Sequence, residues 1–269
     1  MENKVKTISE HLQSAEDMAR FCFFYAIRDV ANRLCPEKSP GECIARHTIL
    51  LFHILGFSDS TQWEENELCR MIFDAAERFG NLSFEEFENA MWQHCGNAIL
   101  QRAEELYPKS RGIYTPPSWN CGCLKSDPPT PENPELCRFH IYNTVSPHSI
   151  FTDPEYLVLC FRLLMKENRL HYNSSALITS TWLNDHPRWL EFFPAEFHQS
   201  LTPRNPDKAP GMTVGSWGFL YNARGCANMK YIRSIRQTGE LPFLPRTGSC
   251  SFDAMTRHLD ILSKRKQEK

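Results

Sequence analysis

The sequence is poor in glycine, with 12 glycines among 269 residues. It contains neither a Gly-x-Gly-x-x-Gly string nor a Gly-x-x-x-x-Gly-Lys-Ser/Thr string, so the usual nucleotide-binding loops have no support. No apolar run approaches the roughly 20 residues that a membrane helix needs. The N-terminus also lacks the apolar core of a signal peptide. We therefore expect a soluble, cytoplasmic protein that has no membrane partner.

The chain also lacks an excess of charge of either sign. Its 30 Lys and Arg residues balance 32 Asp and Glu residues, which leaves a net charge of −2. This balance argues against a cationic protein that binds nucleic acid, so a small molecule is the expected partner. A hydrophobic content of 41%, with 18 Phe, 8 Tyr and 6 Trp, excludes general disorder.

Residues 1–107 have the hydrophobic period of helices. One of these helices is clearly delimited, because Ser39 can cap it, Pro40 suits its first position and Gly56 can end it. Four helices with short connections predict a compact helical domain over this range.

A proline-rich segment, residues 108–136, is expected to connect this helical domain to a second domain over residues 137–269. In the second domain, strand-like and helical segments alternate. Four segments are predicted to be strands: Cys137–Asn143, Ala176–Thr181, Val214–Tyr221 and Leu241–Leu244. The sequence thus predicts an α+β fold, with a helical N-terminal domain followed by a mixed α/β domain that holds a sheet of at least four strands.

Three closely spaced cysteines, Cys121, Cys123 and Cys137, lie near His140 in the sequence. Cysteine and histidine are the usual ligands of structural zinc, so this group predicts a zinc site. The alternative is a set of reduced thiols that pack as small hydrophobic residues.

A second group of polar residues follows the first predicted strand of the second domain. It consists of His140, Asn143 and His148, which fall where that strand ends and a helix begins. Ligand sites gather at such places in open α/β sheets. Either histidine could act as a general acid or base, while Asn143 and His148 are expected to contact the substrate.

A third group, at the next junction of strand and helix, comprises Trp182, Asn184, Asp185 and His186. Either Asn184 or Asp185 can cap the helix that Pro187 opens. Capping explains only one of them, so the remaining side chains are candidates for catalysis, with Asp185 orienting a histidine.

The last candidates are Trp217 and a set of arginines, namely Arg233, Arg236 and Arg246. Because a guanidinium group suits a carboxylate or phosphate, these arginines indicate an anionic substrate. We expect Arg236 to hold the anionic group, and Trp182 and Trp217 to exclude water.

Residues His140, Ile141, Ser149, Trp182 and Leu183 resemble short motifs of GNAT-like N-acyltransferases that carry a helical N-terminal domain. The resemblance covers residues 137–220. It implies an acyltransferase that uses an acyl-coenzyme A. The loop that holds the coenzyme A pyrophosphate in that family has no clear counterpart here, and the nearest string is residues 224–227.

Together these features predict an enzyme that transfers an acyl group to a small amine or similar nucleophile at a site between the two domains. His140 or His186 would deprotonate the nucleophile, and Asn184 would hold a carbonyl oxygen. Two alternatives stay open. One is a binding or scaffold protein with a structural zinc loop, and the other is a metal-dependent enzyme that uses His140, His148 and His186.

Overall fold

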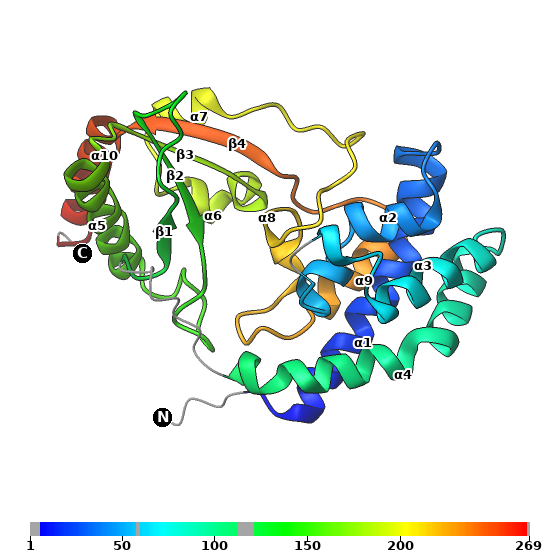
Figure 1. The fold of residues 1–269 in the computed structure, drawn as a ribbon. Coiled ribbons are helices and arrows are strands. Elements are labelled where there is room, and N and C mark those ends of the chain that lie inside the picture. Colours follow the sequence, from blue (N-terminus) through cyan, green and yellow to red (C-terminus); the bar gives the residue numbers. More distant parts are fainter. Residues whose placement is uncertain (1–5, 58–59, 112–120, 268–269) are drawn as a thin grey trace. The chain divides into compact units, whose positions relative to one another are not determined.

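The computed structural model describes residues 6–57, 60–111 and 121–267 (Figure 1). The chain forms two compact units. A helical unit comprises residues 1–112 and 205–242, and a sheet unit comprises residues 113–204 and 243–269. Residues 112–120 of the proline-rich segment lie outside the described residues. The predicted α+β fold, with helices first and a sheet of four strands, is confirmed.

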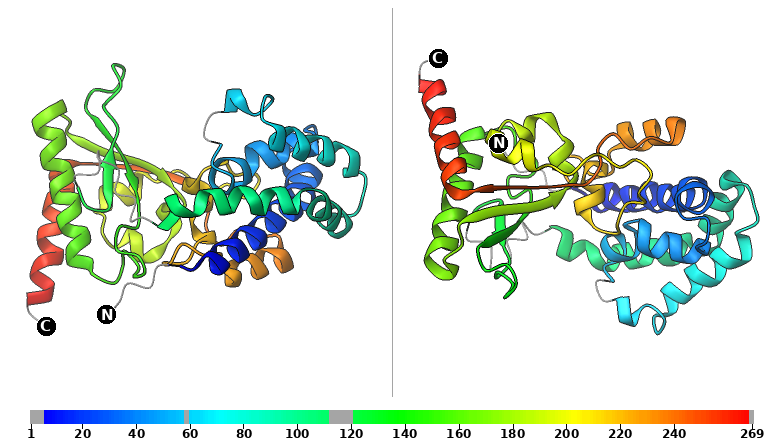
Figure 2. Two further views of the ribbon diagram at one scale, coloured as in Figure 1. Left: turned by 60° about the horizontal axis from the view of Figure 1, so that its bottom comes forward. Right: turned by 90° about the horizontal axis from the view of Figure 1, so that it is seen from above.

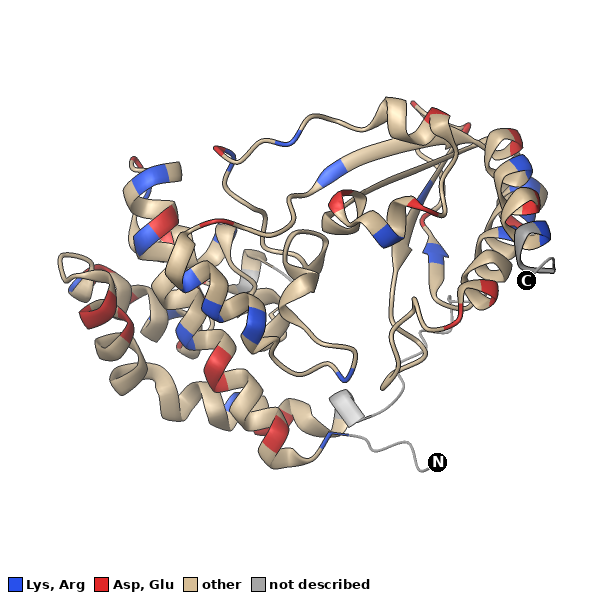
Figure 3. Ribbon diagram, turned by 180° about the vertical axis from the view of Figure 1, so that it is seen from behind, with Lys and Arg blue, Asp and Glu red and all other residues tan. Residues whose placement is uncertain are grey.

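Within the described ranges, no helix has the length and apolar character needed to cross a bilayer. Basic and acidic residues both occur on helices of the two units (Figure 3).

The helical unit contains the four helical regions that the hydrophobic period predicts. Its elements are α1 (Ile8–Tyr25), the π-helix η1 (Ala26–Leu34), α2 (Pro40–His47), the π-helix η2 (Leu50–Ile54), the 3-10 helix η3 (Ser60–Gln62), α3 (Glu67–Phe79), α4 (Phe84–Arg111), α8 (Val214–Trp217), the 3-10 helix η5 (Gly218–Leu220) and α9 (Met229–Thr238). The cap of α2 forms as predicted, since the Ser39 side chain accepts a hydrogen bond from the Glu42 amide. The single helix predicted to run from Ser39 to Gly56 is wrong, because extended backbone at Thr48 divides it into α2 and η2. Large side chains such as Phe21, Phe23 and Tyr25 fill the interior.

Residues 205–242, which the sequence assigns to the α/β part, pack in the helical unit. The predicted strand Val214–Tyr221 is wrong, because this stretch forms α8 and η5. Successive residues Ser216 and Trp217 are both buried, whereas a half-buried strand alternates between faces. The Trp217 indole donates a hydrogen bond to the Gly211 carbonyl oxygen over 2.7 Å, which ties the segment together.

His53, in η2, gives the helical unit a pH-dependent contact. Its Nε2 atom accepts a hydrogen bond of 3.1 Å from the Val214 amide. Burial lowers the pKa of His53 to about 4. In an unfolded chain the pKa of histidine is about 6.5, so the unfolded state takes up this proton first as the pH falls. The contribution of His53 to stability is therefore complete above about pH 6.5 and is lost as the pH falls toward 4.

Replacing His53 by glutamine is expected to remove this part of the pH dependence. The free energy of unfolding of the natural protein should fall more steeply between pH 6.5 and 4, by up to about 1.4 kcal/mol per pH unit. Urea denaturation of both proteins at a series of pH values measures the difference. Two parallel pH profiles would contradict the assignment.

The sheet unit is built on four strands, β1 (Leu124–Ser126), β2 (Leu136–Ile141), β3 (Ala176–Thr181) and β4 (Arg246–Ser251). They lie in the order β1-β2-β3-β4. Strands β1 and β2 are antiparallel, β2 and β3 are parallel, and β3 and β4 are antiparallel. The chain crosses from β2 to β3 through the long helix α5 (Pro154–Tyr172). This is the connection that a parallel pair requires.

One face of the sheet lies on the core of this unit. Residues Cys137 and Phe139 of β2, Leu177 of β3 and Cys250 of β4 point into it. The helices of the unit are α5, η4 (Trp182–Asp185, a 3-10 helix), α6 (Pro187–Leu190), α7 (Ala195–Ser200) and α10 (Phe252–Gln267). Helix α10 lies beside α5 (Figure 2), and two ion pairs of 2.7 Å, Arg162–Asp260 and Arg169–Asp253, join them.

The strand β4 was not predicted, and the predicted strand Leu241–Leu244 is wrong. The sequence of β4, Arg-Thr-Gly-Ser-Cys-Ser, is short of the branched and aromatic residues that favour strands. Its full-length pairing with β3 and its contact with α7 stabilise it instead. Position 248 of β4 has no room for a larger side chain than that of glycine, because the ring of Phe197 lies directly against Gly248.

Replacing Gly248 by alanine is expected to destabilise the sheet unit. The added Cβ would lie 2.6 Å from the Phe197 ring and 2.9 Å from Leu201. Since Phe197 is fully buried, overpacking should cost about 1–3 kcal/mol of unfolding free energy. Chemical denaturation measures this loss. The control is Gly211→Ala, where the nearest atom lies at 3.5 Å. Equal stability of the two variants would contradict the packing described here.

Candidate functional site

The parallel strands β2 and β3 separate at their carboxyl ends. Their register runs from Leu136 opposite Ala176 to Arg138 opposite Ile178. The Thr179 hydroxyl then donates a hydrogen bond of 3.0 Å to the Phe139 carbonyl oxygen. Beyond these residues β2 pairs with β1 while β3 stays paired with β4, and the two strands diverge (Figure 1). Ligands in α/β sheets usually bind at the carboxyl ends of parallel strands. The segments that follow β2 and β3 are therefore the first candidates for a site.

His186, which follows β3 and η4, is surrounded by three aromatic rings. Its imidazole stacks on Phe151, with ring centroids 5.3 Å apart and planes 11° from parallel. The ring centroids of Phe243 and Trp182 lie 5.0 Å and 6.1 Å away. Because Phe151 belongs to the segment between β2 and α5, the stack joins the segments that follow the two strands. We call these four residues the aromatic cluster.

The Nδ1 atom of His186 is buried and has no hydrogen-bond partner among the residues that the structure describes. Burial lowers the pKa of His186, and the charge of Arg188 lowers it further. The imidazole is therefore neutral at a pH where an exposed histidine is still partly protonated. A neutral imidazole with an unpaired nitrogen can accept a proton from a nucleophile.

Asp185, the neighbour of His186, is held by backbone and arginine donors. Its carboxylate accepts a hydrogen bond of 3.0 Å from the Leu244 amide and lies 3.0 Å from Nε of Arg204. A second guanidinium, that of Arg246, lies 3.7 Å away. One carboxylate thus faces two guanidinium groups, which leaves an excess of positive charge. These contacts do not include the imidazole of His186, so the expected orienting role of Asp185 finds no support here.

Asn184 is fully buried, and its amide group is used within the unit. Its Nδ2 atom donates to the carbonyl oxygens of Thr179, at 2.9 Å, and Arg246, at 2.7 Å. Its Oδ1 atom accepts from the Trp189 indole over 3.0 Å. Both amide hydrogens are therefore occupied, and none is left for the substrate carbonyl that the sequence assigns to this side chain.

His140 lies on the opposite face of β2 from the core residues Cys137 and Phe139. Its side chain is half exposed, and Nε2 lies 2.6 Å from a carboxylate oxygen of Asp127. Residues at odd separations on a strand point to opposite faces, so His140 cannot join Cys137 around one metal ion. The aromatic contacts of His186 do not involve His140.

Asn143 and His148 form the turn that follows β2. The Asn143 side chain accepts from the Val145 amide and donates to the His148 carbonyl oxygen over 2.9 Å. The side chain of Asn143 is thus engaged in the turn, while His148 is exposed.

The three cysteines of the predicted zinc site pack in the core of the sheet unit. Burial raises the pKa of Cys121 to about 11 and that of Cys137 to about 12, which favours protonated thiols. Cys123 is fully buried beside Cys160. Among the residues that the structure describes, no three His, Cys, Asp or Glu side chains are placed to hold a metal ion. The structure therefore supports the packing of these thiols as small hydrophobic residues.

Trp217 and Arg236 belong to the helical unit, where both serve its packing. Trp217 is buried, with its ring edge-on to Tyr25 at a centroid distance of 5.0 Å. Arg236 donates to the buried carboxylate of Glu88 over 2.7 Å. The string at residues 224–227 is a turn, in which Arg224 pairs with Glu10 at 2.9 Å.

The sequence patterns do not point to Phe151, Arg204 or Phe243. They indicate Arg246 as a binding residue but not its position beside Asp185. Phe151 stands just before the capping residue Asp153 of α5, and Phe243 stands between two prolines. Large apolar residues in such loops are a weak signal that the loop packs back on its domain. The sequence offers no means of pairing them with His186.

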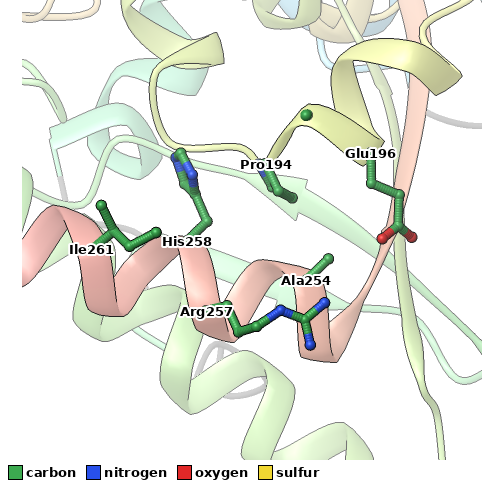
Figure 4. Close-up of a pocket in the computed structure, with 7 residues that line it drawn as sticks. Pro194, Glu196, Ala254, Arg257, His258 and Ile261 are labelled. Atoms are coloured by element: carbon green, nitrogen blue, oxygen red, sulfur yellow. The ribbon is translucent and has the colours of Figure 1, made fainter.

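A shallow depression lies between α7 and α10 (Figure 4). Two of its polar residues, Glu196 and His258, are engaged in structural contacts. Glu196 accepts hydrogen bonds from the backbone and hydroxyl of Ser251. His258 lies 3.0 Å from the Glu191 carbonyl oxygen. The aromatic cluster, with its unpaired imidazole nitrogen, is the stronger candidate.

Comparison of this chain with protein-family models, curated proteins and solved structures finds no match. The resemblance to N-acyltransferases therefore stands on the short motifs of the sequence alone.

Proposed function

We propose that the sheet unit transfers an acyl group from a coenzyme A thioester to a small amine, with His186 as the general base. The observation that carries this proposal is the separation of β2 and β3 at their carboxyl ends, next to a neutral histidine with a buried, unpaired nitrogen. The short motifs that resemble N-acyltransferases lie on these same strands and on the segments after them.

The residues where β2 and β3 separate fit an acyl-coenzyme A donor. A strand directs alternate backbone amides and carbonyls to either side. The Phe139 carbonyl oxygen accepts from the Thr179 hydroxyl over 3.0 Å, and beyond these residues the backbone of β2 no longer pairs with that of β3. An extended arm of a coenzyme that contains amide groups can form hydrogen bonds to the backbone of a strand, as an added strand does. The excess positive charge of Arg204 and Arg246 around Asp185 suits an anionic group of the donor or acceptor.

The chemistry of the step is a simple exchange of bonds. Bound acyl-coenzyme A supplies an acyl carbon activated by its thioester. The neutral imidazole of His186 takes a proton as the amine forms a C–N bond to that carbon, and the C–S bond breaks. The leaving thiolate then receives a proton, which restores neutral His186. Phe151, Trp182 and Phe243 exclude water from the imidazole, which keeps it in the neutral form.

The direct test is to incubate the pure protein with acetyl-coenzyme A and a panel of small amines, including amino acids. Mass spectrometry should detect an acylated amine that forms only when the protein is present, together with free coenzyme A. If coenzyme A esters raise the melting temperature but no amine is acylated, the chain is a binding protein rather than an enzyme. If the esters neither bind nor react, the proposal fails.

A further inference from the structure

The helical unit contains a thiol that differs from the other cysteines of the chain. Of the eleven cysteines, all free, nine are buried, and only Cys35 and Cys226 are partly exposed. A reactive thiol must be accessible to its electrophile and must lie near a group that favours the thiolate. These two are therefore the candidates, and their surroundings differ.

Cys35 lies next to the imidazole of His47, the last residue of α2. Its Sγ atom is 4.0 Å from Nε2 of His47. The other ring nitrogen, Nδ1, lies 2.9 Å from the carbonyl oxygen of Pro210. A carbonyl oxygen only accepts, so Nδ1 carries the hydrogen and donates it. Nε2 of the neutral ring is then left with a lone pair that faces the thiol.

The backbone holds Cys35 in this place from both sides. Its amide donates to the Val30 carbonyl oxygen over 2.7 Å, and its own carbonyl oxygen accepts from the Lys38 amide over 3.1 Å. Cys35 is thus the nucleophile, His47 the base, and the Pro210 carbonyl oxygen the group that orients the base. This arrangement activates cysteine in nucleophilic catalysis.

Cys226 has the cations Lys6 and Arg224 nearby, but burial outweighs their effect and raises the pKa of its thiol. Burial also raises the pKa of Cys43, which lies near Cys35, to about 12. Neither of these thiols is expected to compete with Cys35 for an electrophile.

We infer that Cys35 is a nucleophilic thiol, activated by His47, that forms mixed disulfides with small disulfides such as oxidised glutathione. In the step, Nε2 of His47 accepts the thiol proton and Sγ attacks one sulfur of the disulfide. A new S–S bond forms, the old one breaks, and the leaving thiolate takes the proton. The products are the mixed disulfide and one molecule of reduced thiol, with no other oxidant required.

The test treats the native protein with oxidised glutathione at neutral pH and follows the added mass with time. Peptide mapping should place the first addition on Cys35. The variant Cys35→Ser should lose this fast phase, whereas Cys226→Ser should keep it. The variant His47→Asn, which retains a donor near Nδ1 but lacks Nε2, should slow the reaction by about tenfold or more.

Two results would overturn the inference. One is first addition at Cys226 or at a buried cysteine in the natural protein, a comparison that needs no variant. The other is an unchanged rate at Cys35 in a His47→Asn protein that has the melting temperature of the natural chain. Because this site lies in the helical unit, its failure would leave the proposed acyl transfer untouched.

Discussion

Replacing His186 by glutamine is expected to lower the rate of acyl transfer by about 10²–10⁴-fold, the usual contribution of a general base. Glutamine keeps a polar group at this position but cannot accept the proton of the amine. Steady-state rates of the variant and the natural protein measure the loss. The binding of the acyl donor should change much less than the rate.

The matched control is His258→Gln, which alters a histidine on α10 whose contact is with a backbone carbonyl oxygen. This variant should keep the natural rate. The pH profile adds a second check, because burial lowers the pKa of His186. Activity should persist below the pH at which an exposed histidine becomes protonated. Equal rates for His186→Gln and the natural protein would exclude His186 as the base.

Replacing Asn184 by alanine is expected to lower the free energy of unfolding by about 3–5 kcal/mol. The change would leave the buried carbonyl oxygen of Thr179 and the half-buried one of Arg246 without the Asn184 donor. It would also remove the acceptor of the Trp189 indole. Each buried polar group that loses its partner costs about 1–3 kcal/mol. Urea denaturation measures the difference.

The control for this variant is Asn133→Ala, at an exposed position of the same unit. We expect it to change stability by no more than about 0.5 kcal/mol. If Asn184→Ala changed the free energy of unfolding as little as the control and instead abolished binding of the acyl donor, Asn184 would have the substrate-binding role that the sequence assigns to it.

The sequence predicts the elements of this fold well where hydrophobic period and end signals agree. The strand β3 forms over the predicted range Ala176–Thr181, and the cap of α2 at Ser39 is as expected. Prediction failed where tertiary contacts override local preference. Strand β4 is rich in small polar residues and depends on its pairing with β3, whereas the aromatic stretch at Val214 is helical because its side chains fill another core.

The candidate site was predicted in part. His186 could be found because polar residues gather after a predicted strand, which is where ligands often bind. Asn184 has the same signal, but the structure uses it to join Thr179, Arg246 and Trp189. A hydrogen-bonding side chain at such a junction can serve packing or chemistry, and only its partners in space decide between them.

The central claim is that an acyl donor binds where β2 and β3 separate. Hydrogen–deuterium exchange with and without saturating acetyl-coenzyme A tests it directly. We predict slower amide exchange in residues 139–153 and 179–186, the carboxyl ends of the two strands and the segments that follow them. Unchanged exchange in both segments, or protection confined to α7 and α10, would contradict it.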